Sequence, residues 1–202
     1  RSSGYDPQIP ADWTVPNTGW EGWLPSERYP LILNPETQRL WSANSRTVSG
    51  TALTVLGNGG YDLGARATQI RDQLFAREHF VATDMRAIQL DDRALLAERW
   101  QQRLATTLTS ASKDTPWVSA LENALQDWNR HAAADSVAYR AVHTFRRNVM
   151  KTVLNGFAAQ IRQHDASFEM PRLSQAEWIV WQLIEHQPQH LLPSTFTTWE
   201  EL

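Results

Sequence analysis

Asn44 is the first side chain in the sequence whose type and position could support catalysis. It closes an apolar segment that is expected to be a strand, and small and polar residues follow it at 45–50. Asparagine is depleted within strands, so a specific interaction is expected to compensate for it. Its amide could donate a hydrogen bond to an oxyanion, which lowers the barrier to acyl transfer. The local sequence by itself favours the other interpretation, in which the amide satisfies the following turn.

Arg66 is the second candidate. It lies three residues after Leu63 and four before Ile70, which places it on the apolar stripe of an expected helix. A charged side chain there must reach solvent or find a partner, because an unpaired buried charge is costly. It could hold a carboxylate or an amide carbonyl of an active site, or it could bridge the helix to a sheet. Arg71 lies off this stripe and is expected at the surface.

The acidic and histidine side chains do not predict a metal site. The spacing of Asp84, Asp91 and Asp92 fits helix capping better than metal coordination. His186 and His190 are four residues apart, but a proline between them prevents a shared helix face. The GxSxG, HExxH, phosphate-loop and dinucleotide motifs are absent from the sequence. We therefore expect no metal, no cofactor and no conventional catalytic triad.

Composition narrows the classes of partner. The sequence has no cysteine, which excludes disulfides, thiol catalysis and thiolate metal sites. Its net charge of -3 and pI near 6.1 lack the basic footprint of a nucleic-acid-binding protein. No apolar run approaches the roughly 18 residues of a membrane span, so neither nucleic acid nor membrane is expected as a partner. The 10 tryptophans indicate either a large core or interface, or an aromatic-lined pocket for an acyl-bearing ligand.

The elements expected to position these residues are one hairpin followed by about five helices. Residues 29–45 predict a β-hairpin around a turn at 34–37. Because a two-stranded hairpin is marginal alone, it predicts a larger sheet outside this sequence. Helical periodicity with capping signals predicts helices that begin near Asp62, at Asp91 or Asp92, at Thr115, across 136–163, and from the Ser174–Glu177 capping box to Pro188.

Both ends of the chain are expected to be cut from a longer protein. Residues 1–22 are rich in proline and glycine, and residues 1–6 lack the apolar core of a signal peptide. Residues 196–202 predict the first turn of a helix, with Thr198 as its cap and acidic residues after it. Since a helix is not expected to stop after one turn, the chain is expected to be an internal segment.

Several segments resemble motifs of the penicillin acylase family, whose members are N-terminal-nucleophile hydrolases. The segment Asn-Pro-Glu-Thr-Gln-Arg-Leu-Trp-Ser-Ala-Asn-Ser-Arg at 34–46 resembles the family's NP-x-x-G-x-L-x-T-A-N-N/A-R. Four more resemblances follow in the family's order: Gly-Tyr-Asp-Leu-Gly-Ala-Arg-Ala-Thr-Gln-Ile at 60–70, Asp84-Met85 with Ile88-Gln89-Leu90-Asp91, Trp128 with Asp135-Ser136, and Trp199-Glu200. One such match is weak, but five in the same order, from about residue 20 to the end, are specific.

The resemblance implies an α+β fold, a fragment of a four-layer αββα architecture. The whole chain, 1–202, would be an internal fragment of the large β chain, with a sheet hairpin at 20–50 and a helical region at 60–202. Asn44 matches the family's oxyanion-hole asparagine, and Arg66 matches an arginine that supports the active site. The implied enzyme cleaves linear amides, such as β-lactam side chains or other N-acylated compounds, through an acyl-serine intermediate. Its nucleophilic serine, with its own α-amino group as base, would lie upstream.

The resemblance also implies partners and a location. The partners would be the rest of the same self-processed precursor, namely the small α chain and the N-terminal part of the β chain, and a small-molecule amide substrate. A role in antibiotic biosynthesis and a periplasmic or secreted location follow from the family alone. Residues 51–56 lack the carboxylate that calcium-binding members carry there, so no calcium is predicted, and Gln38 replaces a usual glycine. The alternatives are a non-catalytic or degenerate helical binding module on the same scaffold, and a tryptophan-rich carbohydrate-binding domain.

Overall fold

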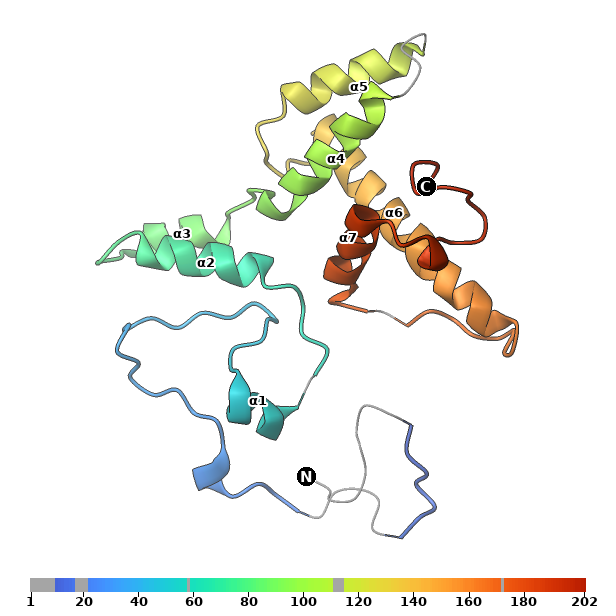
Figure 1. The fold of residues 1–202 in the computed structure, drawn as a ribbon. Coiled ribbons are helices and arrows are strands. Elements are labelled where there is room, and N and C mark those ends of the chain that lie inside the picture. The colour runs from blue at the N-terminus through green and yellow to red at the C-terminus, as the bar shows by residue number, and fades with distance from the viewer. Residues whose placement is uncertain (1–9, 17–21, 58, 111–114, 172) are drawn as a thin grey trace. The chain divides into compact units, whose positions relative to one another are not determined.

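The computed structural model describes most of the chain in two compact units (Figure 1). The described residues are 10–16, 22–57, 59–110, 115–171 and 173–202. The first unit comprises residues 1–40 and 46–59, and the second comprises residues 41–45 and 60–202. Asn44 and Arg66 therefore both belong to the second unit.

The described part of the first unit is mostly irregular and contains the helix α1, Gly50–Leu56, and a short 3-10 helix, Ser26–Arg28. The helix α1 was not predicted, because its threonines and valine are weak helix formers. Gly57 ends it with a φ of 80°, and its N–H donates to the carbonyl of Leu53 over 2.7 Å. No residue of α1 is buried, so this helix adds little to a core.

The second unit is helical. Its α-helices are α2 (Ala65–Phe75), α3 (Ala82–Gln89), α4 (Glu98–Thr109), α5 (Pro116–Gln126), α6 (Val137–Arg162) and α7 (Ala176–His186), with 3-10 helices at Leu95–Ala97 and Gln189–Leu191. A helix lies in each of the five segments where periodicity predicts one, which confirms that these helices exist, whereas α3 was not predicted. The predicted starts of α2 and α4 are wrong, because Gly64 and Ala97 stand at their N-caps in place of Asp62 and of Asp91 or Asp92.

The core of this unit forms around α6, which contacts α4, α5 and α7. The buried side chains of α6 recur at helical spacing on one face: Ala138, Val142, Val149, Val153 and Ala158. On α4, Trp100, Leu104 and Leu108 are buried four residues apart and belong to the same apolar cluster. The expectation that tryptophans fill a core is met at Trp100, Trp128 and Trp199, while others, such as Trp117 and Trp178, are exposed.

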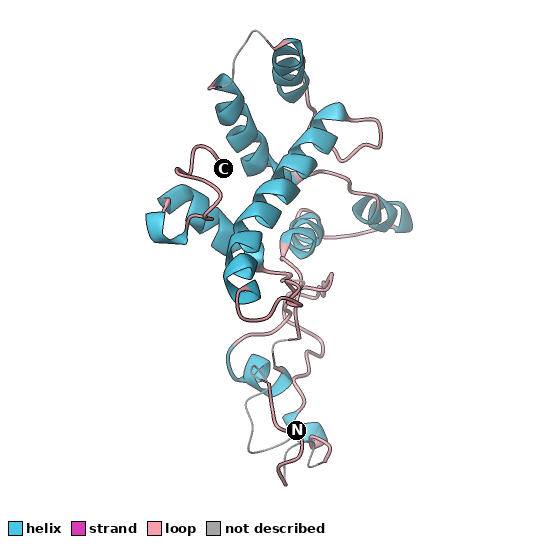
Figure 2. Ribbon diagram, turned by 90° about the vertical axis from the view of Figure 1, so that its right-hand side faces the viewer, coloured by secondary structure: helices cyan, strands magenta, loops and turns pink. Residues whose placement is uncertain are grey.

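The predicted β-hairpin is wrong, and with it the α+β fold class. Residues 29–45 contain no strand, and the described ranges as a whole hold helices and loops with one isolated antiparallel bridge, between Arg93 and His131 (Figure 2). A turn does form here, one residue later than predicted, since the N–H of Gln38 donates to the carbonyl of Pro35 over 2.8 Å. A two-stranded hairpin is marginal without a third strand, and positive φ angles at Asn34 and Gln38 interrupt the extended path.

Two predicted helix starts near the C-terminal end are also wrong. The capping box at 174–177 does not form: Gln175 stands at the N-cap of α7 without a side-chain cap, and Glu177 is buried. Residues 196–202 form turns, in which the N–H and Oγ1 of Thr197 donate to the carboxylate of Glu201 over 2.7–2.8 Å. In both places a glutamate expected near a helix start binds elsewhere. Glu177 has partners on other helices, and Glu201 binds the nearby Thr197. None of the described helices is long and apolar enough to cross a membrane.

Candidate active site

The structure brings Asn44 and Arg66 into direct contact. Nη2 of Arg66 donates to Oδ1 of Asn44 over 3.0 Å and to the carbonyl of Ala43 over 3.2 Å. The two residues are 22 positions apart, so a tertiary contact joins them. The amide oxygen of Asn44 thus accepts from an arginine of α2 instead of satisfying the turn that follows it.

Asp62 contacts both residues of this pair. Its backbone N–H donates to the carbonyl of Asn44 over 2.9 Å. Its Oδ2 lies 3.3 Å from Nη2 of Arg66, one helical turn further along the chain. Asp62 was predicted only as a helix cap and not as a site residue. The signal was present in the four-residue spacing between an acidic and a basic residue, which favours a side-chain pair.

The backbone at this point takes an unusual path. Ala43 has a φ of 150° and Asn44 a φ of 57°, both in the positive range that L-residues rarely adopt. Asparagine tolerates the left-handed conformation better than other residues with a side chain. The type of residue at position 44 therefore suits both the backbone turn and the side-chain contact with Arg66.

Arg66 lies in the first turn of α2 and is not on its buried stripe, so that part of the sequence prediction is wrong. Its side chain is 60% exposed, whereas Ala67 and Leu74 form the buried face of the helix. Arg66 binds the carboxylate of Asp62, the amide oxygen of Asn44 and the backbone carbonyl of Ala43, and its role at an active site stays a prediction. Among the described residues there is no sheet for it to bridge.

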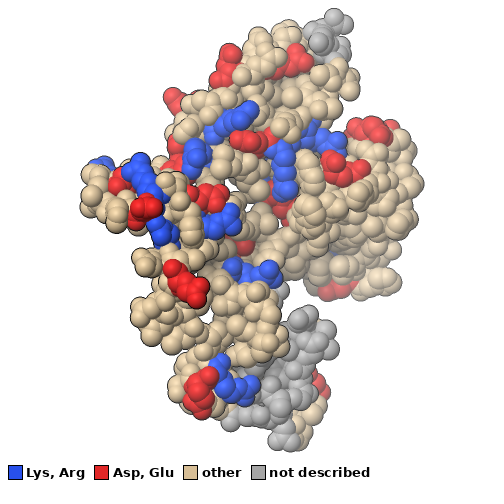
Figure 3. All heavy atoms as spheres, turned by 60° about the vertical axis from the view of Figure 1, so that its left-hand side comes forward, with Lys and Arg blue, Asp and Glu red and all other residues tan. Residues whose placement is uncertain are grey.

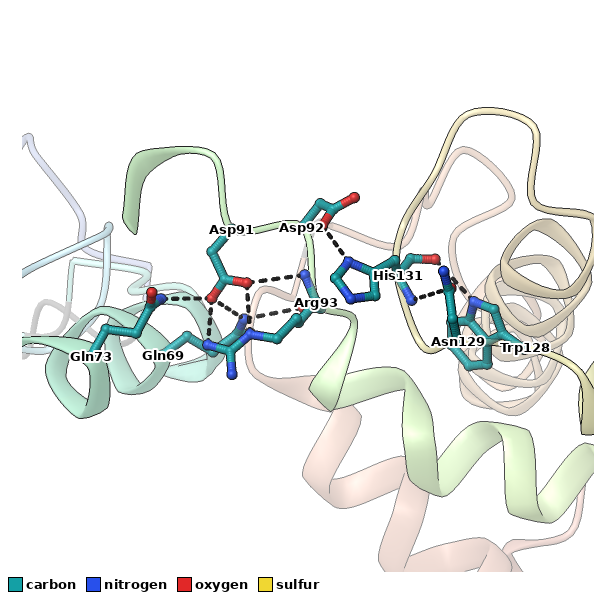
Figure 4. Close-up of polar contacts among 8 residues, drawn as sticks. All are labelled: Gln69, Gln73, Asp91, Asp92, Arg93, Trp128, Asn129 and His131. Atoms are coloured by element: carbon teal, nitrogen blue, oxygen red, sulfur yellow. Dashed lines mark hydrogen bonds and ion pairs between the residues drawn. The ribbon is translucent and has the colours of Figure 1, made fainter. Parts of the chain in front are cut away.

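A second polar cluster surrounds Asp91 (Figure 4). Nε2 of Gln69 and Nε2 of Gln73 donate to Oδ2 of Asp91 over 3.1 and 2.7 Å, from one face of α2. Nε and Nη2 of Arg93 donate to the two carboxylate oxygens, each over 2.7 Å. These hydrogen bonds, those from Arg93 above all, hold the pKa of Asp91 well below its usual range. Asp91 therefore links α2 to the segment before α4. The prediction that Asp91 caps a helix is wrong.

The two other acidic residues also have structural partners. Oδ2 of Asp84 accepts from the N–H of Val81 over 3.0 Å at the start of α3, and Asp84 pairs with Arg77, so its predicted capping role is confirmed. Asp92 pairs with Nδ1 of His131 beside the isolated bridge, as Figure 4 shows, and so does not cap a helix.

No histidine pair or acidic group marks a metal centre in the described ranges. His186 is the last residue of α7, and Gln187 after it adopts a left-handed φ of 50°. His190 lies in the following 3-10 helix, which confirms that the two histidines share no helix face. The described residues contain no group of three or more histidine, aspartate or glutamate side chains that could hold a metal ion. Figure 3 shows acidic and basic side chains interspersed on the drawn face, without a large patch of one sign.

Comparison with known proteins adds one result. The sequence model described as penicillin amidase matches residues 1–199 of the 202-residue chain. The searches of curated proteins and of solved structures gave no match.

Proposed function

The chain belongs to the penicillin amidase family, and on this premise we propose that it is part of an amidohydrolase that cleaves linear acyl amides through an acyl-serine intermediate. In this proposal Asn44 is the oxyanion donor and Arg66 supports it. The nucleophilic serine belongs to a part of the enzyme outside this chain, together with the α-amino group that acts as its base.

The observation that carries the proposal is the hydrogen bond from Arg66 to Asn44. A guanidinium group has only donors, so the amide of Asn44 must turn its oxygen toward Arg66. The NH₂ group of Asn44 then points away from Arg66 and is oriented as a donor. No described residue accepts a hydrogen bond from this NH₂ group. An oriented donor without a protein acceptor is what an oxyanion hole requires.

The chemistry follows from this orientation. Attack of the serine oxygen on the amide carbonyl converts that carbonyl oxygen into an oxyanion. Nδ2 of Asn44 would donate to it, and the stabilisation would be greater in the transition state than in the ground state. The positive charge of Arg66, next to the amide oxygen of Asn44, polarises the amide and makes its N–H a better donor.

The remaining parts of the enzyme follow from the family. We propose that this chain functions with the rest of the same precursor, the small α chain and the N-terminal part of the β chain, after autocatalytic processing. Side chains of β-lactams and other N-acylated small molecules are the proposed substrates, and a periplasmic or secreted location and a role in antibiotic biosynthesis are part of the same proposal. The alternative is a helical binding module that keeps the scaffold without the chemistry.

Substitution of Asn44 in the full-length enzyme tests the proposal. Asn44→Asp keeps an oxygen for Arg66 and replaces the NH₂ donor with a second carboxylate oxygen, which adds a negative charge, while Asn44→Ala removes both groups. Each variant should lower kcat on an acyl-anilide by roughly 10²–10³, the usual effect of losing one oxyanion donor. The matched control is Asn34→Ala, which removes another asparagine with a left-handed φ, 48°, outside the site. A loss below about threefold in both Asn44 variants would contradict the proposal and favour the binding module.

A further inference from the structure

We propose that Asp62 is a positioning residue of this site, which holds Asn44 and Arg66 in register with each other. This inference rests on the proposed function. The backbone of Asp62 binds Asn44, and its side chain binds Arg66. Its N–H donates to the carbonyl of Asn44 over 2.9 Å, and its carboxylate lies 3.3 Å from Nη2 of Arg66.

The geometry around Nη2 of Arg66 explains why the guanidinium needs a partner that holds it in place. This one nitrogen, which carries two hydrogens, faces three acceptors: the carbonyl of Ala43, Oδ1 of Asn44 and Oδ2 of Asp62. Two of these acceptors are neutral, and only the carboxylate of Asp62 is charged. Since charge-assisted hydrogen bonds are the stronger ones, Asp62 is the acceptor that best holds the guanidinium in place.

Because Arg66 is exposed to solvent, the carboxylate of Asp62 is important for the orientation of Arg66 and, through it, of the Asn44 amide. The Arg66 side chain is 60% exposed, so water competes for its donors and many of its rotamers are accessible. Without the carboxylate of Asp62, Arg66 would spend less time against Asn44, and the amide of Asn44 would lose its fixed orientation. An exposed ion pair of this kind contributes little to folding, so the expected consequence is catalytic.

The direct test is Asp62→Ala in the full-length enzyme. We expect kcat to fall about fivefold, as for the loss of a coupled neighbour, with KM within about twofold and thermal stability nearly unchanged. Asp62→Asn keeps an acceptor oxygen without its charge and should give a smaller loss of kcat. The control is Asp72→Ala, which removes an aspartate of α2 that pairs with another arginine, Arg71, and should leave kcat unchanged. A kcat of Asp62→Ala equal to wild type would overturn the inference.

A double-mutant cycle with Arg66 separates positioning from a general structural role. If Asp62 acts through Arg66, Asp62→Ala should cause no further loss of kcat in an Arg66→Ala background. An equal loss in both backgrounds would overturn the inference. Should Asp62→Ala fail to fold, Asp62→Asn takes its place in the cycle with the same criteria.

The variant Asn44→Ala distinguishes failure of the proposed function from failure of the inference on Asp62. If Asn44→Ala lowers kcat strongly while Asp62 variants behave like wild type, this inference fails and the proposed function stands. If Asn44→Ala has no effect, the proposed function fails, and the inference fails with it.

Discussion

The indole N–H of Trp100 donates a hydrogen bond of 2.7 Å to Oε1 of Glu177, and both side chains are buried. Nη2 of Arg99 donates to the same oxygen over 2.8 Å, and Arg146 binds Oε2 through both Nε and Nη2. Glu177 is 1% exposed and joins α4, α6 and α7 through these contacts. Burial raises the pKa of Glu177, but the hydrogen bonds from Arg146, Arg99 and Trp100 together outweigh it and lower that pKa below its ordinary value.

The first prediction concerns the charge of Glu177. Glu177→Gln keeps the shape of the side chain but leaves two arginines facing a neutral amide, so we expect a loss of about 3–5 kcal/mol in the free energy of unfolding. Urea denaturation of the chain measures it. The control is Glu185→Gln on the same helix, which removes an exposed pair with Arg103 and should cost less than about 1 kcal/mol. Equal losses in the two variants would contradict the prediction.

The second prediction is a pH dependence of stability that comes from Glu177. Its pKa is lower in the folded chain than the ordinary 4.5. The unfolded chain therefore takes up the proton first as pH falls, and protonation favours unfolding. The stabilisation is fully present above pH 4.5 and is lost as the pH falls toward and through the lower folded pKa.

Unfolding free energies measured from neutral pH down to about pH 3 check this dependence. The wild-type curve should fall more steeply below pH 4.5 than the curve of Glu177→Gln, which cannot titrate at this position. Glu185→Gln should retain the wild-type slope. Parallel curves for wild type and Glu177→Gln would show that Glu177 does not carry the acid sensitivity.

The third prediction compares two helix N-caps. Oγ of Ser136 accepts from the N–H of Tyr139 over 3.1 Å and caps α6, the helix at the centre of the core. Ser136→Ala should lower the free energy of unfolding by about 1 kcal/mol. Thr115 stands at the N-cap of α5 without a side-chain cap, so Thr115→Ala is the matched control and should be nearly neutral. Chemical denaturation of both variants measures the difference, and a larger effect at Thr115 would refute the assignment.

Local sequence patterns predicted the helices of the second unit because periodicity and capping act over a few residues. The apolar positions along 136–163 recur at helical spacing, and α6 spans Val137–Arg162 with Ser136 as its cap. Family resemblance, which depends on the order of motifs along the chain, predicted membership of the penicillin amidase family, and the match over residues 1–199 confirms it. It also selected Asn44 and Arg66 as site residues, whose catalytic roles stay predictions.

The tertiary structure alone decided three other features, because each depends on segments far apart in the chain. The capping pattern before α7 could not indicate that Glu177 binds Arg99, 78 positions away. The apolar segments at 29–45 could not indicate that they form no strand among the described residues, since pairing requires partner strands. The presence of asparagine at position 44 could not indicate whether its amide binds the following turn or a distant residue. The contact with Arg66, 22 positions away, fixes that amide's orientation, because a guanidinium can only donate.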